Sequence, residues 1–179
     1  MSWKIVNAIG YQIVWLTSVA RAGHGDPYSG PLAAIAFAVF VLAFGGQRRS
    51  DLQLVPLVLA IGFLADGAWI ALHLLDYGAP WPSASFTPAW MLGIWLAFGM
   101  TLNHSFAFLK GRHALAALLG AVGGPLAYWS AARGFGAVHF IAPPPVVFTC
   151  LCLAWIALAP LLMLLADRMH VRRQQMAAP

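Results

Sequence analysis

Residues 52–75 read LQLVPLVLAIGFLADGAWIALHLL, an apolar run in which Asp66 is the only formally charged residue. A helix needs about 20 mostly apolar residues to cross the hydrocarbon core of a bilayer, and this run reaches that length. The run therefore predicts a transmembrane helix. It also places a carboxyl group at membrane depth, where ionisable residues usually mark a functional or an internal structural position.

The composition of the whole chain agrees with this class. Of the 179 residues, 61% are hydrophobic and 8% are charged, whereas soluble domains carry about a quarter charged residues. The net charge of +5 does not indicate nucleic-acid binding, because the basic residues stand singly or in pairs between apolar runs. Cys150 and Cys152 lie in one apolar run and point to different sides of a helix, so we expect neither a disulfide nor a metal site.

Five further runs reach membrane-spanning length, and breaks rich in glycine, proline or charge separate them. We therefore expect an all-α integral membrane protein, a single domain over 1–179 formed by a bundle of six transmembrane helices at about 3–22, 28–45, 52–75, 88–109, 114–132 and 146–166. The second and sixth runs carry almost no polar residues and are predicted to be the lipid-facing wall. The other four runs should enclose a polar interior.

The distribution of Lys and Arg predicts the orientation of the bundle, because cytoplasmic loops carry an excess of both. One side holds Arg21 and Arg133; the other holds Lys4, Arg48, Arg49, Lys110, Arg112, Arg168, Arg172 and Arg173. We therefore expect both termini in the cytoplasm. A cleaved signal peptide is the alternative for the first run, since a small-residue motif ends at Ala22. Asn7 and Gln12 oppose it, because they make a poor apolar centre.

Asp66 is the deepest carboxylate, about 20 Å from the cytoplasmic end of its run at the rise of a helix. An Asp at that depth must be protonated, paired or hydrated, so Asp66 is a candidate catalytic residue. His73 follows on the same helix face and is a candidate substrate contact, as is Arg133 at the outer end of the fifth run. The structural alternative is that Asp66 forms an ion pair with Arg133 or Arg21, or accepts a hydrogen bond.

Asn103 and His104 stand together in the fourth run, where we expect them in its cytoplasmic half. A neutral imidazole can accept or donate a proton near neutral pH, and an amide can orient the polar group of a substrate. Both residues are therefore candidate catalytic residues. The alternative is that His104 is a hydrogen-bonded core residue. In the first run, Asn7 and Gln12 are candidate substrate contacts, or they bond neighbouring helices.

The fifth run combines small residues with a proline. Gly120 and Gly124 lie one turn apart and would let another helix approach closely. Pro125 cannot donate to the carbonyl of Ala121, so the helix should kink there and leave that carbonyl in need of a partner. Tyr128, one turn further on, would turn its hydroxyl to the interior and is a further candidate catalytic residue.

Two stretches carry a family resemblance, Thr101-Leu102-Asn103-His104-Ser105 and Gly123-Gly124-Pro125-Leu126-Ala127-Tyr128-Trp129. Together with Asn7-x-x-Gly10-x-Gln12, His24-Gly25 and Asp66-Gly67, they make the chain resemble a proteobacterial family of small inner-membrane proteins described as a domain of unknown function. The resemblance covers nearly the whole chain. It implies a membrane protein without an assigned activity and an association with fatty-acid methylation and membrane-lipid modification.

Three functions remain open from the sequence. The first is an enzyme, or an accessory factor, that acts on membrane lipids, in which Asp66 or His104 moves protons. The second is a small proton-linked carrier, and the third is a scaffold in which every polar residue joins helices. We expect membrane lipids as partners, with a homo-oligomer or a lipid-modifying enzyme as further candidates, and no cofactor, metal or nucleic acid.

Overall fold

Six α-helices make up most of the described chain, which confirms the predicted helical class. The computed structural model describes residues 2–177, and the side chains of residues 2–169. The helices are α1 (Trp3–Gly23), α2 (Ser29–Phe44), α3 (Arg48–Ala71), α4 (Ala89–Leu102), α5 (His113–Phe135) and α6 (Pro144–Ala177). A 3-10 turn covers Ala107–Leu109. Two short strands, β1 (Leu75–Tyr77) and β2 (Val138–Phe140), pair antiparallel with Leu75 opposite Phe140.

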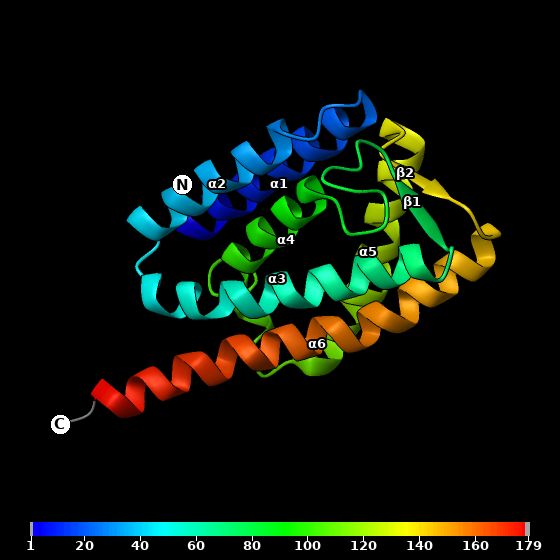
Figure 1. The fold of residues 1–179 in the computed structure, drawn as a ribbon. Coiled ribbons are helices and arrows are strands. Elements are labelled where there is room, and N and C mark those ends of the chain that lie inside the picture. Colours follow the sequence, from blue (N-terminus) through cyan, green and yellow to red (C-terminus); the bar gives the residue numbers. More distant parts are fainter. Residues whose placement is uncertain (1, 178–179) are drawn as a thin grey trace.

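The helices form one bundle with α4 in its middle (Figure 1). α1 and α2 lie side by side on one flank of α4, α3 packs against another, and α5 and α6 pack mainly against each other. Both chain ends lie at one end of the bundle, and the β1–β2 ribbon closes the other end. An up-and-down order explains this placement, because an even number of helices returns the chain to the end of the bundle at which it began.

Three helices are long and apolar enough to cross a membrane by length and composition: α3, α5 and residues Pro144–Met169 of α6. α2 and α4 are apolar but shorter, with 16 and 14 residues. At 1.5 Å per residue α4 is about 21 Å long, less than the hydrocarbon thickness of about 30 Å. The length and apolar composition of these three helices are those expected of a membrane protein.

Several helix ends differ from the sequence-based expectation. α3 runs from Arg48 to Ala71 rather than over 52–75, because Leu75 already pairs in the ribbon. α4 ends at Leu102 rather than at 109, because the following residues turn back to form side-chain hydrogen bonds described below. α6 begins at Pro144, and its helix continues to Ala177. The side chains of Arg172 and Arg173 lie outside the described residues.

The predicted division into two wall helices and four interior helices is wrong. α4 is the interior helix: ten of its fourteen residues are buried. α1 exposes Ile5 and Ile9, and α5 exposes Leu118 and Val122, just as α2, α3 and α6 expose large apolar side chains. Five helices therefore present an apolar outer surface around α4.

The small residues of α5 serve close packing against α6, as the sequence predicted. A Cβ atom on Gly120 would lie 2.6 Å from both the Cβ of Ala159 and the backbone oxygen of Trp155. The Ala121 carbonyl that Pro125 leaves free accepts a hydrogen bond from Cys152 Sγ at 3.3 Å. The proline in α5 is therefore compensated by a side chain of its neighbour.

Substitution of Gly120 tests this contact. Gly120→Ala should lower the free energy of unfolding in detergent micelles by about 1–3 kcal/mol, because the new methyl group meets backbone that must shift. Gly123→Ala is the matched control, since a Cβ there meets nothing within 4 Å. That variant should be neutral or more stable by up to about 1 kcal/mol, the helix-propensity gain. Equal effects of both variants would contradict the close α5–α6 contact.

Candidate functional site

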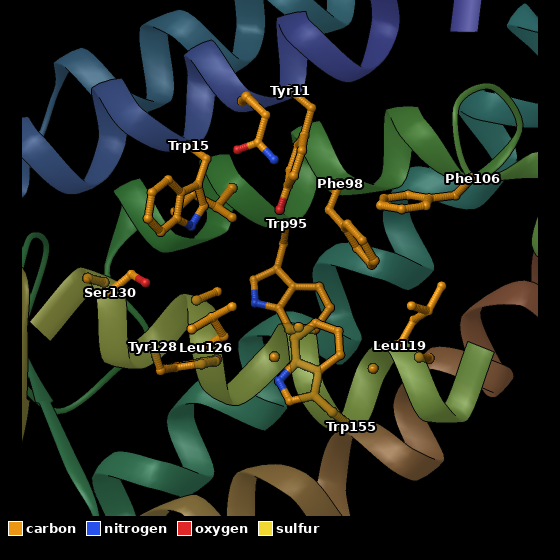
Figure 2. Close-up of a pocket in the computed structure, with 18 of the residues that line it drawn as sticks. Tyr11, Trp15, Trp95, Phe98, Phe106, Leu119, Leu126, Tyr128, Ser130 and Trp155 are labelled. Atoms are coloured by element: carbon orange, nitrogen blue, oxygen red, sulfur yellow. The ribbon is translucent and has the colours of Figure 1, made fainter. Parts of the chain in front are cut away.

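A cavity of about 370 Å³ lies between α1, α4, α5 and α6 (Figure 2). Aromatic side chains dominate its lining, and no charged residue of the described part contributes to it; the rings include Tyr11, Trp15, Trp95, Phe98, Phe106 and Trp155. The rings of Trp95 and Trp155 stack at 5.5 Å with an interplanar angle of 4°. Ligand pockets in proteins have about this size and apolar character.

The cavity reaches the outer surface between α1 and α5. Gln12 of α1 and Gly123 and Leu126 of α5 line it and are also exposed. The two helices meet near the ribbon, where the Trp15 and Phe135 rings pack edge to face at 5.9 Å. The exposed lining residues stand near the middle of both helices, so the mouth faces sideways rather than toward either end of the bundle.

Asp66 lies behind the cavity wall and is fully buried. Its Oδ1 accepts hydrogen bonds from the hydroxyls of Tyr77 and Tyr128, and its Oδ2 accepts one from Trp95 Nε1, each at 2.6 Å. Tyr128 and Trp95 also line the cavity, whereas Asp66 does not. The carboxyl group thus holds Trp95 and Tyr128 of the cavity wall in place from the side that faces away from the cavity.

Of the two structural alternatives considered for Asp66, the described residues show the hydrogen bonds and not an ion pair with Arg21 or Arg133. Arg21 instead contacts Asp26 at 2.8 Å, and Arg133 is exposed. His73 is also exposed, in a left-handed conformation with φ of 52° after the end of α3. His73 and Arg133 therefore contact neither Asp66 nor the cavity.

Asn103 and His104 belong to a second polar cluster, centred on the fully buried Asp51 of α3. Asn103 Nδ2 donates to Asp51 Oδ1 at 2.8 Å, and His104 Nε2 lies 3.0 Å from Asp51 Oδ2. Trp3 Nε1 donates to His104 Nδ1 at 3.0 Å, and Lys110 Nζ donates to Asn103 Oδ1 at 2.8 Å. All of these residues stand at the end of the bundle that holds the chain termini.

Trp3 determines the tautomer of His104. An indole N–H can only donate, so Nδ1 of His104 must accept and carry no proton. Nε2 then carries the proton of the neutral imidazole and donates a hydrogen bond to Asp51 Oδ2. Both ring nitrogens are occupied, so His104 could act as a base only after Trp3 had moved away.

The two clusters are separate. Asp51 and Asp66 stand fifteen residues apart on α3, which is about 22 Å at the rise of a helix. Asp66 and Tyr128 therefore do not share a site with Asn103 and His104. Asn7 joins neither: its Nδ2 donates to the Met100 carbonyl at 3.1 Å, and its Oδ1 accepts from Ser105 Oγ at 2.7 Å. That is the helix-joining role considered for Asn7.

Sequence reasoning missed Asp51, Tyr77 and Trp95. Asp51 follows the Arg48-Arg49 pair and lies just outside the predicted helix at 52–75, yet it stands in the first turn of α3. The helix N-terminus favours a carboxylate there, and that position was an available signal. Tyr77 and Trp95 donate to Asp66 from separations of 11 and 29 residues, for which the sequence carries no periodic signal.

Two ionisable groups outside the long helices have perturbed pKa values. The hydroxyl of Ser29 and the backbone N–H of Tyr28 hold the pKa of Asp26 well below its ordinary value. Partial burial lowers the pKa of Lys110, while the charges of Asp167 and Asp51 oppose that shift. Among the described residues, no group of three or more His, Cys, Asp or Glu side chains could hold a metal ion.

Removal of the Asp66 carboxyl group should destabilise the protein strongly. Asp66→Ala leaves three buried donors without an acceptor, at about 1–3 kcal/mol each, whereas Tyr128→Phe removes a single bond. We expect a loss of at least about 3 kcal/mol in the unfolding free energy for Asp66→Ala and a smaller loss for Tyr128→Phe. Asp76→Ala, at an exposed aspartate, should stay within about 0.5 kcal/mol. A stable Asp66→Ala protein would contradict this bonding.

Comparison with curated proteins and with solved structures finds no match. The family described as "Protein of unknown function (DUF2878)" matches over residues 4–161, nearly the whole chain. This match agrees with the resemblance that the Thr-Leu-Asn-His-Ser and Gly-Gly-Pro stretches indicate. The chain therefore belongs to the DUF2878 family.

Proposed function

We propose that this chain is a six-span protein of the bacterial inner membrane that binds an apolar lipid chain between α1 and α5. It would serve as an accessory factor in membrane-lipid modification. The sideways mouth of the cavity carries this proposal, because a lipid in the surrounding bilayer could enter through it without leaving the membrane.

The six-span arrangement is supported by the bundle itself. α1, α2 and α4 run alongside the three helices of membrane-spanning length, and α1 begins at the same end of the bundle at which α6 ends. The end with the termini carries Lys4, Arg48, Arg49, Lys110, Arg112 and Arg168, whereas Arg21 and Arg133 stand at the opposite end. The positive end would be cytoplasmic. α1 is retained in this proposal, because Asn7 and Trp3 bond residues near the end of α4.

The character of the lining supports a lipid as ligand. The cavity offers aromatic and aliphatic surface and no charge, which suits an acyl or isoprenoid chain and excludes a charged headgroup from its interior. Its mouth stands near the middle of α1 and α5, the level at which lipid chains rather than headgroups would surround the protein.

An accessory role is favoured over catalysis by the bonding of the candidate proton carriers. Both oxygens of Asp66 and both ring nitrogens of His104 already have partners within the protein. A proton-linked carrier has less support, because the fully buried Leu54 and Val58 stand between Asp51 and Asp66 on α3. A scaffold without ligand would be indicated if no lipid copurifies.

The orientation can be tested with two matched cysteine substitutions at exposed alanines. Ala84→Cys, in the segment before α4, should react with a membrane-impermeant maleimide in intact spheroplasts. Ala114→Cys, at the start of α5, should react only after lysis, because the proposed topology places it in the cytoplasm. The wild-type protein gives the background from Cys150 and Cys152. Labelling of both positions in intact cells, or the reverse pattern, would contradict the proposed topology.

Filling of the cavity mouth tests lipid binding. Gly123→Phe places a ring where a Cβ meets nothing within 4 Å, so the chain should fold while the cavity is blocked. We expect crosslinking to a photoreactive fatty-acid probe to fall about tenfold or more, equivalent to roughly 1.4 kcal/mol. Gly134→Phe is the control, since that glycine is equally open and does not line the cavity. Undiminished crosslinking of Gly123→Phe would place the lipid elsewhere.

A further inference from the structure

The cavity holds polar groups that the protein itself does not satisfy. Tyr11, Gln12, Trp15 and Ser130 all line it. Within residues 2–169, whose side chains the structure describes, none of these four side chains has a hydrogen-bond partner. The buried side chains of Tyr77, Tyr128, Trp90 and Trp95 differ, because each donates to an acceptor in the protein.

The unpartnered groups gather around the cavity from two helices. Tyr11 and Trp15 are four residues apart and so share one face of α1. Figure 2 shows both side chains directed from α1 toward the cavity, with the Tyr11 hydroxyl extended away from its helix and Ser130 across from them on α5. Gln12 stands at the exposed mouth.

These groups define what a complementary ligand must offer. An indole N–H only donates, so Trp15 requires an acceptor on the ligand, and the hydroxyls of Tyr11 and Ser130 can donate to further acceptor oxygens. No cation lines the cavity to neutralise an anion, and a charge at the level of the mid-helix mouth would be costly. The acceptors should therefore be uncharged and set within an apolar body.

We propose that the cavity recognises an uncharged lipid that carries acceptor oxygens, such as ketone or quinone carbonyls, part-way along its apolar chain or within its ring. This inference rests on the lipid-binding function proposed above and specifies its ligand. A plain saturated chain would leave Tyr11, Trp15 and Ser130 unpaired in an apolar medium, which disfavours it. The parallel rings of Trp95 and Trp155 add a flat surface against which a planar carbonyl segment can lie.

The test compares two probes that share a terminal methyl ester and differ only in the mid-chain acceptor. The first is a fatty-acid methyl ester with a ketone at mid-chain, and the second is the saturated methyl ester of equal length. Each competes with a photoreactive fatty-acid probe for the full-length protein in nanodiscs. We expect the wild-type protein to bind the keto ester about tenfold more tightly than the saturated ester, as two neutral hydrogen bonds would give.

Two variants assign this preference to the cavity. Tyr11→Phe and Trp15→Phe should each weaken binding of the keto ester by about two- to tenfold and leave the saturated ester unchanged. Tyr28→Phe is the matched control, because Tyr28 is exposed and lies against Trp81 outside the cavity. Its affinities should equal those of the wild-type protein.

The possible outcomes separate this inference from the function on which it rests. Equal binding of both esters by the wild-type protein would overturn the acceptor proposal and leave lipid binding intact. Binding of neither ester, together with crosslinking that Gly123→Phe does not reduce, would overturn both. A loss of preference in Tyr28→Phe as large as that in Tyr11→Phe would place the acceptor site outside the cavity. The wild-type comparison remains decisive even if one of the variants fails to fold.

Discussion

The buried carboxyl group of Asp66 determines where four parts of the chain lie. Asp66 comes from α3, and its three hydrogen-bond donors come from β1, α4 and α5. In an apolar interior, leaving the carboxyl group or any of its donors unpaired raises the free energy of the folded state. The ribbon that closes one end, the central helix and the cavity wall are therefore fixed by the same constraint, and Trp95 and Tyr128 can line the cavity only in the positions that this bonding allows.

The polar residues inside the bundle fall into two groups, those whose polar atoms are hydrogen-bonded within the protein and those whose polar atoms have no partner there. Asp66, Asp51, His104 and Asn7 have their polar atoms bonded within the protein, so their presence at depth does not by itself indicate chemistry. Tyr11, Trp15 and Ser130 are less conspicuous in the sequence, yet they face an apolar cavity without partners. In a membrane interior the informative polar groups are those that the fold leaves unpaired, because each of them is unfavourable until a ligand arrives.

The existence of all six helices could be predicted from the lengths of the apolar runs, and the close approach of α6 to Gly120 followed from small residues at helical spacing. The end of α4 could not be predicted, because the apolar pattern continues through Phe106 and Leu109 while side-chain bonds to Asp51 terminate the helix. The hydrogen-bond partners of Asp66 could not be predicted either, because Tyr128 is 62 residues away in the sequence. The local pattern of apolar residues indicates where helices form. Which side chains bond across the bundle depends instead on which helices become neighbours. Of the candidate site residues, Tyr128 and Gln12 reach the cavity, and His73 and Arg133 do not.

The enclosure of α4 has a consequence for the order in which the protein is made. α4 is synthesised before α5 and α6, yet Trp95 stacks on Trp155 of α6, and the Asp66 carboxyl group that it bonds is shared with Tyr128 of α5. In the proposed six-span arrangement α4 is also too short to match the bilayer unaided. The contacts that hold it would then form only once the last helix has entered the membrane, and until that point the nascent chain would be an open, incompletely packed assembly.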